Sequence, residues 1–416
     1  MTNICWECIE DQSLREIVRG ESVLEQCAEC NEIAQTVSVE RLGQLIANVF
    51  REHFEIGEEV KLFDGADDDR GYYHQQGEEL SDVLQELTGQ CFSFQDELVA
   101  AVCDTDDYWP PDGGEPFFDA SYCYQRIKIA RKEYKNRWKE IHAGLLHKQR
   151  FFNKEAEALF SDLFGEINTL KSWNETAGTL TDPAILDLPE NSRIYRARAA
   201  ESNSLLLKIV ENPLANVGPP PAESAKAGRM NAEGVCILYG ARELSTCLAE
   251  MRPPIGGQTA VIQLQTTSQL RLLDFSRLET AYSGGGLSFF HENFAHEADK
   301  QSFLRRLHEL ISRPVTPGNE SDYMITQTMT EFLAYRLDPK IDGFLFRSAQ
   351  SEEGQNIVLF PHSRMNIFPV EYVPDTLEFF RTKTIDYKHD ALEPFIHRDV
   401  VYLQSEHDYY EPDGDY

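Results

Sequence analysis

The 416-residue sequence has no long hydrophobic run. Its longest apolar stretches, such as residues 98–103, hold about six residues, whereas a membrane-spanning helix needs about 20. The first residues also lack the basic and apolar segments of a secretory signal. The sequence therefore predicts a cytoplasmic protein without a membrane partner.

Basic residues are scarce, because 39 Lys and Arg face 70 Asp and Glu, a net charge of −31. A surface this acidic repels phosphate backbones and disfavours a nucleic-acid partner. The charge is uneven: residues 1–125 hold 29 acidic and 6 basic residues, a balance of −23, whereas residues 126–154 hold 2 acidic and 10 basic ones, a balance of +8. The basic stretch is either a solvated helix face or a patch that meets a phosphate or an acidic surface of the same protein.

The glycine motifs of common nucleotide-binding folds are missing. No G-x-G-x-x-G follows an expected strand, and no G-x-x-x-x-G-K-[ST] occurs. G-x-S-x-G is absent as well. Rossmann, P-loop and α/β-hydrolase interpretations are therefore excluded.

Apolar residues nevertheless make up 41 % of the chain, which is enough to bury cores in a multidomain protein. Residues 35–176 show apolar residues at helical spacing, and we expect an all-α domain there. The expected helices span residues 38–56, 78–88, 92–103, 121–146 and 151–173.

The pattern changes after residues 177–189, a predicted linker marked by Gly178, Pro183 and Pro189. Short period-two strands then alternate with helices, which predicts a mixed α+β domain over residues 190–370. A C-terminal extension with an acidic tail follows over 371–416. The expected strands are 192–198, 235–239, 260–264, 270–274, 342–346 and 356–360, and the expected helices are 243–251, 291–310 and 323–337.

Two C-x-x-C pairs lie near the N-terminus, Cys5 with Cys8 and Cys27 with Cys30. Two such pairs can supply four thiolates to one tetrahedral Zn²⁺. The sequence therefore predicts a structural zinc knuckle over residues 1–34, the alternative being four incidental thiols. With all four positions filled by protein, we expect no catalysis at this metal.

Several short motifs follow one another in the C-terminal half: Gly228-Arg229-Met230-Asn231, Leu238-Tyr239-Gly240-Ala241, Glu250-Met251-Arg252-Pro253, Phe346-Arg347-Ser348 and Asn356-Ile357-Val358-Leu359-Phe360. Their order resembles the RES domain over residues 190–365. Arg196 matches the arginine of the family's opening strand. Ser348 matches the motif serine, with Ser351 nearby as the alternative.

The resemblance implies a fold like that of ADP-ribosyltransferases and the destruction of NAD⁺ by hydrolysis or phosphorolysis, with NAD⁺ and inorganic phosphate as small-molecule partners. It also implies a toxin or defence effector, in many members paired with an antitoxin. The catalytic residues it implies are Arg229, Tyr239, Glu250 and Ser348, and the substrate-binding residues are Arg196 and Asn356.

These residue types suit that chemistry. A guanidinium binds a diphosphate bidentately, which is the expected role of Arg229. Cleavage of the N-glycosidic bond builds positive charge on the ribose, which the Glu250 carboxylate can stabilise. Tyr239 can supply an aromatic platform for nicotinamide.

Two alternatives remain open from the sequence. The same residues could transfer ADP-ribose to a macromolecule, or the domain could be a catalytically silent interaction module whose pocket senses a nucleotide. Whichever holds, the expected protein partners are an antitoxin or sensor protein and a second copy of the chain. An acidic N-terminal segment such as residues 67–69 could also restrain a positive pocket. In that case residues 185–416 alone should be the faster enzyme.

The helical part is similar to HEPN domains, some of which are ribonucleases with an R-x4–6-H motif. Arg137 and His142 fit this spacing. Placed near one helix face, they could act as acid and base on a phosphodiester. A scaffold or sensor helix is the simpler interpretation.

Overall fold

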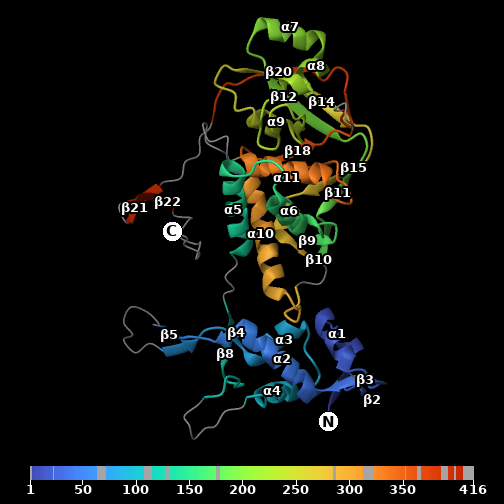
Figure 1. Ribbon diagram of the computed structural model, residues 1–416, viewed down its shortest axis with the longest axis vertical. Helices are drawn as coiled ribbons and strands as arrows, with labels where there is room; N and C mark the ends of the chain where they lie inside the picture. Colours follow the sequence, from blue (N-terminus) through green and yellow to red (C-terminus); the bar gives the residue numbers. More distant parts are fainter. Residues whose placement is uncertain are drawn as a thin grey trace. The chain divides into compact units, whose positions relative to one another are not determined.

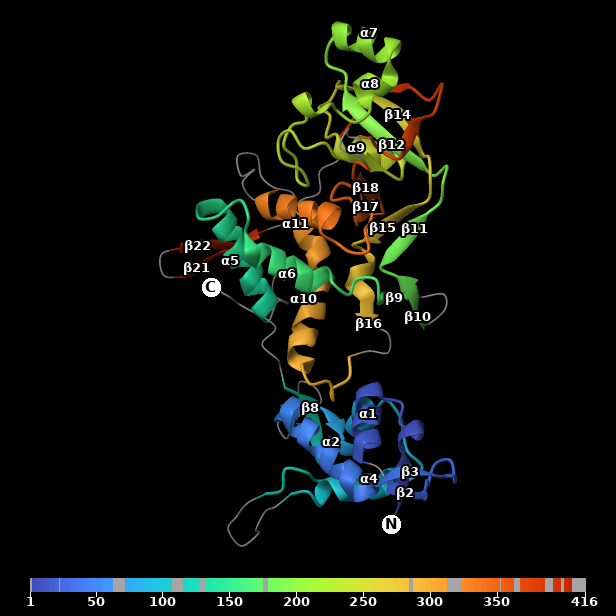
Figure 2. The ribbon, with the colours of Figure 1, turned by 45° about the vertical axis from the view of Figure 1, so that its right-hand side comes forward.

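The computed structural model describes residues 2–21, 23–62, 72–106, 115–127, 132–174, 179–283, 287–312, 323–351, 353–362, 367–385, 392–397 and 400–405 (Figures 1 and 2). The chain divides into two compact units. The first unit comprises Met1–Leu186, Gly228–Met230 and Arg271–Ile341, and the second comprises Asp187–Ala227, Asn231–Leu270 and Asp342–Tyr416.

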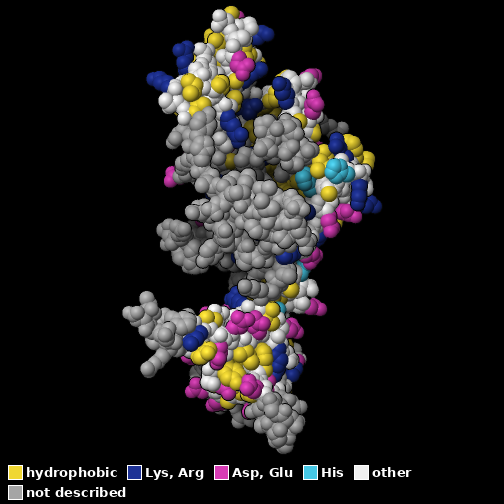
Figure 3. Space-filling view, turned by 90° about the vertical axis from the view of Figure 1, so that its left-hand side faces the viewer, with side chains coloured by type: hydrophobic (Ala, Val, Ile, Leu, Met, Phe, Trp, Pro, Cys, Tyr) yellow, Lys and Arg dark blue, Asp and Glu magenta, His cyan; other side chains and the backbone are white. Residues whose placement is uncertain are grey.

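The N-terminal lobe of the first unit packs short strands around α2, whose buried residues include Leu42, Ile46 and Phe50. Ser38 caps α2 by accepting the amide of Arg41 through its side chain. On the face seen in Figure 3, acidic side chains lie beside hydrophobic ones over this lobe, in the lower part of the view. The lobe contains β1 (Asn3–Cys5), η1 (Trp6–Cys8), α1 (Gln12–Glu21), β2 (Val23–Gln26), β3 (Ile33–Ser38), α2 (Val39–His53), β4 (Phe54–Ile56), β5 (Glu59–Leu62), β6 (Tyr72–Gln75), β7 (Glu78–Glu79), α3 (Leu80–Thr88), α4 (Gln95–Cys103) and β8 (Cys123–Arg126).

Four further helices of the first unit pack on one another: α5 contacts α6, α10 and α11, and α6 contacts α11. The strands β9, β10 and β16 form a small antiparallel sheet in the order β10-β9-β16. Two strands, β11 (Ile185–Leu188) and β15 (Leu270–Asp274), cross the boundaries of the units along the chain. The remaining elements are α5 (Glu133–His147), α6 (Lys154–Phe164), β9 (Leu170–Asn174), β10 (Thr179–Pro183), η4 (Arg277–Thr280), β16 (Ala281–Ser283), α10 (Phe294–Ser312) and α11 (Met324–Tyr335).

The second unit is built on antiparallel strands in the order β17-β18-β13-β12-β14-β19, and β20 also pairs with β14. A small core joins Ala241, Cys247 and Val261, which come from β13, α9 and β14. Its elements are β12 (Arg193–Ala199), α7 (Asn203–Glu211), α8 (Pro213–Val217), η3 (Ala222–Ser224), β13 (Leu238–Ala241), α9 (Leu244–Glu250), β14 (Gln258–Thr266), β17 (Gly343–Arg347), β18 (Gln355–Leu359), β19 (Val370–Tyr372), β20 (Glu378–Arg381), β21 (Leu392–His397) and β22 (Val400–Ser405).

The α+β character of residues 190–370 is confirmed, whereas the expectation of an all-α region over 35–176 is wrong in part. Strands β4 to β9 occur within it. The helix expected over 121–146 begins only at Glu133, after strand β8, and the helix expected over 151–173 ends at Phe164, before strand β9. Most of these strands have two to four residues, too few for a period of two to stand out.

The predicted linker 177–189 contains β10 and β11 instead. The sequence also did not foresee that residues 271–341, expected inside the α+β domain, cluster with the N-terminal half. The acidic segment 67–69 and the acidic tail 406–416 lie outside the described residues. Among the described helices, none combines the length and apolar character that a membrane crossing requires.

Candidate active site

The carboxylate of Glu250, at the end of α9, is gripped by two buried side chains of the second unit. Ser348 Oγ donates a hydrogen bond to Glu250 Oε1 at 2.5 Å. Asn356 Nδ2 donates to the same oxygen at 2.7 Å. The amide of Gln350 donates to Ser348 Oγ at 3.0 Å, so the serine hydroxyl proton is left to point at the glutamate. Glu250 itself is exposed, so its carboxylate is oriented and still accessible to a ligand.

The β17–β18 hairpin sets the spacing of these two donors. Phe346 pairs with Asn356 across the hairpin, and the Ser348 amide donates to the Gly354 carbonyl at 2.8 Å. A Cβ on Gly354 would come within 2.2 Å of Thr246 Oγ1 in α9, so only glycine allows this approach. Ser348, and not the alternative Ser351, is the serine whose hydroxyl contacts Glu250.

A second carboxylate, Glu243, ties the hairpin to α9. Its Oε2 accepts from the Gln355 amide and from Thr246 Oγ1, both at 3.0 Å. Glu243 therefore fixes the first turn of the helix that ends in Glu250. Glu243 was not among the site residues expected from the sequence, because a glutamate beside a helix start is an ordinary feature.

The guanidinium of Arg196, in β12, donates hydrogen bonds to two main-chain carbonyls. Its Nη1 donates to the Tyr239 carbonyl at 2.5 Å, and its Nε donates to the Val217 carbonyl at 3.1 Å. Burial lowers the pKa of Arg196, although a guanidinium stays charged in proteins. Arg196 thus joins β12, β13 and the end of α8, and a direct contact with substrate remains a prediction.

Tyr239, in β13, is held by Asn231, which was not among the site residues expected from the sequence. The Tyr239 hydroxyl donates to Asn231 Oδ1 at 2.8 Å. The Asn231 amide nitrogen faces the carbonyls of Lys226, Ala232 and Val235 at 2.9–3.1 Å. Its side chain is 5 % exposed, and three carbonyls around Nδ2 fix which way the amide points. The only signal in the sequence was its position two residues after Arg229.

Arg229 belongs to the segment Gly228–Met230 that clusters with the first unit, whereas the other candidate residues belong to the second. The surroundings of Arg229 are therefore those of the first unit, whose helices hold it. Its Nη1 donates to the Ile311 carbonyl at the end of α10, at 2.7 Å.

Residues 193–382 match the family model of the RES domain. Residues 193–382 are a RES domain. The match runs 12 residues past the boundary expected at 370 and includes β19 and β20. No curated protein and no solved structure matches the chain.

Outside the RES domain, the four cysteines of the two C-x-x-C pairs lie together in the N-terminal lobe. The four Sγ atoms of Cys5, Cys8, Cys27 and Cys30 all lie within 4.8 Å of one another. Cys5 Sγ and Cys30 Sγ are 3.8 Å apart, and a tetrahedron with Zn–S bonds of about 2.3 Å has S–S edges of about 3.8 Å. The spacing fits a metal such as zinc.

One thiol of this cluster is already prepared for metal binding. Burial by itself would raise the pKa of Cys27, but the backbone amides of Cys30, Cys5 and Glu29 donate to its sulfur and lower that pKa to about 7. Burial raises the pKa of Cys5 and Cys8, whose thiols also share hydrogen bonds with their neighbours. A divalent cation would remove the remaining protons, because it binds thiolates.

The two residues of the R-x4-H motif have separate surroundings in α5. Arg137 Nη1 binds Asp162 Oδ2 at 2.9 Å. The Nε2 atom of His142 is buried without a hydrogen-bond partner in the described part of the chain. Neither the contacts nor the comparisons support a HEPN-like site, which stays a prediction.

Proposed function

We propose that the RES domain degrades NAD⁺ by breaking the bond between the nicotinamide nitrogen and the ribose. The bonding electrons leave with nicotinamide, which departs neutral. Water as acceptor gives ADP-ribose and a proton, and phosphate as acceptor gives ADP-ribose 1-phosphate. The observation that carries the proposal is the Glu250 carboxylate, held on one oxygen by Ser348 and Asn356 within a RES domain.

The chemistry asks for a fixed negative charge beside the ribose. Positive charge develops on the sugar as the bond breaks, and a carboxylate that is already oriented stabilises it without reorganising. In this proposal Ser348 and Asn356 hold Glu250, Tyr239 stacks on nicotinamide, and Arg229 binds the diphosphate. Arg196 donates to the Tyr239 carbonyl and so also holds Tyr239 in place, and its direct contact with substrate stays part of the proposal.

The test is nicotinamide release from NAD⁺ by the purified full-length protein, with and without phosphate. Glu250→Gln keeps the size of the side chain and removes its charge, and we expect a loss of about 100-fold or more in turnover. Glu211→Gln, at the exposed end of α7, is the matched control and should turn over normally. Equal rates for the wild type and the Glu250 variant would refute the assignment.

The same assay separates the other outcomes. With NAD⁺ labelled in its adenosine half, transfer to a macromolecule leaves label on protein or nucleic acid, whereas hydrolysis and phosphorolysis release it as a small molecule. NAD⁺ binding without turnover under every phosphate condition would instead identify a nucleotide-sensing module.

We extend the proposal to a role as a toxin or defence effector, because unrestrained NAD⁺ degradation harms the cell that contains it. Induced expression should lower cellular NAD⁺ and stop growth, and Glu250→Gln should do neither. Growth arrest by the inactive variant would disconnect toxicity from the enzyme.

We also propose that Cys5, Cys8, Cys27 and Cys30 hold one structural Zn²⁺. The sulfur spacing supports this proposal. Metal analysis should find about one zinc per chain. Cys8→Ser should lose it, whereas Cys91→Ser, at an exposed cysteine outside the cluster, should keep it. Zinc retained by the Cys8 variant would contradict the ligand set.

A further inference from the structure

The segment that carries Arg229 is mounted on two helices of the first unit. Arg229 Nη1 donates to the Ile311 carbonyl of α10 at 2.7 Å. From α11, Thr326 Oγ1 donates to the Arg229 carbonyl at 2.6 Å, and Gln327 Nε2 donates to the preceding carbonyl at 2.7 Å. The main chain and the side chain of Arg229 are therefore both held by α10 and α11.

The contact with α10 is favourable for both partners. Ile311 is the next-to-last residue of α10, and the last four carbonyls of a helix lack partners within it. A cation is also stabilised at this end of a helix by the helix dipole. The position of Arg229 consequently depends on where α10 ends.

The position of α10 depends in turn on α5. Asp299 of α10 accepts the Tyr134 amide in the first turn of α5 at 2.9 Å, and a carboxylate is favoured at that helix end. The buried Tyr134 hydroxyl donates to Asp162 Oδ2 of α6 at 2.7 Å and lies 2.9 Å from His296 Nε2 of α10. One tyrosine thus joins three helices.

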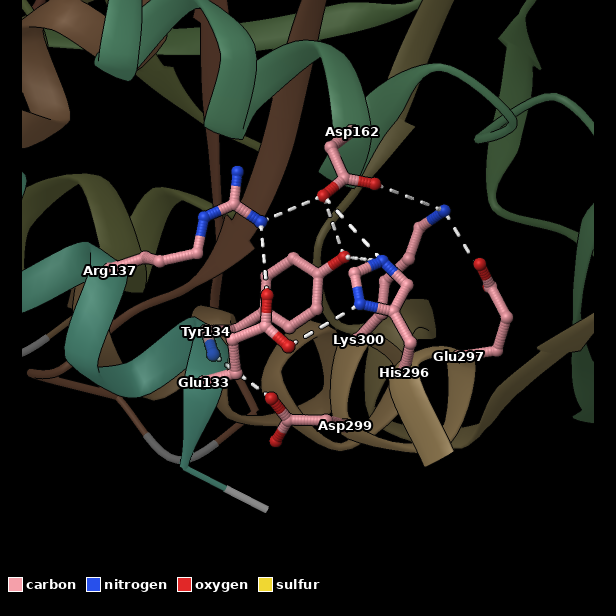
Figure 4. A network of polar contacts seen from close by, with 8 residues as sticks. All are labelled: Glu133, Tyr134, Arg137, Asp162, His296, Glu297, Asp299 and Lys300. Carbon is pink, nitrogen blue, oxygen red and sulfur yellow. Dashed lines mark hydrogen bonds and ion pairs between the residues drawn. The ribbon is translucent and has the colours of Figure 1, made fainter. Parts of the chain in front are cut away.

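Asp162 is the node of this network (Figure 4). Besides Tyr134, its carboxylate binds Arg137 Nη1 of α5 at 2.9 Å, and it lies 3.8 Å from Lys300 Nζ of α10. Burial would raise the pKa of Asp162, but these donors and cations hold it below its usual value. Loss of this charge would remove the ionic link between α5, α6 and α10, while Arg137 and Lys300 each keep a carboxylate on their own helix, Glu133 and Glu297.

Aromatic contacts join the same helices. The rings of Trp138 in α5 and Phe303 in α10 have centroids 5.6 Å apart. Phe160 and Phe164 of α6 approach Phe332 of α11 at 5.8 and 6.4 Å. Both helices that hold Arg229 therefore bury aromatic residues against α5 and α6.

We propose that α5 and α6 are positioning elements for Arg229, acting through α10 and α11, with Asp162 as the key positioning residue. The helices α10 and α11 lie inside the RES match, whereas α5 and α6 precede it. Helices of the N-terminal half thus help to position a residue of the RES domain. The effect on NAD⁺ binding rests on the proposed function, whereas the coupling of α5 and α6 to Arg229 does not.

The first test measures hydrogen exchange in the full-length protein. Asp162→Asn removes the charge that joins α5, α6 and α10, and Glu155→Gln makes the same kind of change at an exposed position of α6. We expect faster exchange in peptides that cover α10 and residues 228–230 for Asp162→Asn, and no change for Glu155→Gln. Tyr134→Phe, which removes only a hydroxyl, should act in the same direction and serves if Asp162→Asn does not fold. Unchanged exchange over 228–230 in Tyr134→Phe or a folded Asp162→Asn would overturn the proposal.

The second test asks whether the effect reaches substrate. We expect Asp162→Asn to raise KM for NAD⁺ about tenfold, with kcat within about twofold, as for a misplaced binding group. In an Arg229→Gln background the same change should have no further effect on KM, whereas a purely structural loss would add to it. Additive effects would refute the positioning role. If the wild type does not turn over NAD⁺ while exchange still responds to Asp162→Asn, the proposed function fails and the link between the helices stands.

Discussion

The geometry around Glu250 makes a definite prediction for Asn356→Asp. This substitution keeps the shape of the side chain and exchanges an amide donor, 2.7 Å from Glu250 Oε1, for a second carboxylate. Two like charges about 4 Å apart repel by about 4 kcal/mol at an effective dielectric constant of 20. That energy corresponds to about three pH units. The two carboxylates should therefore share a proton at neutral pH, as close carboxylate pairs do.

Because one shared proton leaves Glu250 ionised in only part of the molecules, the expected result is turnover several-fold below the wild type at pH 6 that changes as the pH passes through about 7 to 9. Asn356→Ala separates the effect of charge from the lost hydrogen bond, because it should lower turnover by a similar factor at every pH. The assay is the rate of nicotinamide release between pH 6 and 9. A profile for Asn356→Asp that parallels the wild type would show that Asn356 does not adjoin Glu250 in the working enzyme.

Three further predictions follow from other contacts. Asn231→Asp turns an oxygen toward the three carbonyls that now face Nδ2, so urea unfolding should show a loss of about 1–3 kcal/mol, more than for Tyr239→Phe, and equal losses would contradict the assigned amide. Burial lowers the pKa of His53, and the nearby charge of Glu52 offsets this only in part, so the unfolded chain takes up the proton at a higher pH than the folded one. The melting temperature should therefore fall from pH 7.5 to 5.5 and should fall less in His53→Gln. Parallel melting curves for the two proteins would contradict this. A fragment of residues 185–416 lacks the helices that cover Phe303 and Phe332, and burial of each aromatic side chain contributes about 1.5–3 kcal/mol. This fragment should therefore aggregate or turn over NAD⁺ more slowly than residues 132–416. A faster fragment would instead favour restraint by the acidic N-terminal segments.

Periodicity in the sequence predicted the longer elements of the RES domain well. Strands β12, β14, β17 and β18 lie within a residue or two of the expected ranges. Strands β14, β17 and β18 are buried along most of their length, so their short apolar runs marked them as strands. The apolar residues over 151–173 predicted too long a helix, because Ile167 and Leu170 continue the helical spacing after α6 has ended at Phe164. Local spacing does not reveal that Ile167 lies in a turn and that Leu170 begins β9.

The candidate site was predictable only as far as the resemblance carried it. Glu250, Ser348 and Asn356 were selected together, and the structure brings them into contact. Asn231 and Glu243 were missed, because a polar residue in a loop or at a helix start gains its role from carbonyls and amides that fold onto it from elsewhere. The mounting of Arg229 was also beyond the sequence, since Ile311 follows it by 82 residues and contributes only a main-chain oxygen.

The interleaving of the two units also bears on how the protein is made. During synthesis α5 and α6 emerge first, while α10 and α11, which cover their apolar faces, come later along the chain. At about 5–20 residues per second, the interval between Phe164 and Tyr335 is roughly ten to thirty seconds. Throughout that time Trp138 and Phe160 lack the contacts that Phe303 and Phe332 later make with them. The nascent chain is therefore a natural client for chaperones, and the RES domain becomes complete only after most of the protein has been translated.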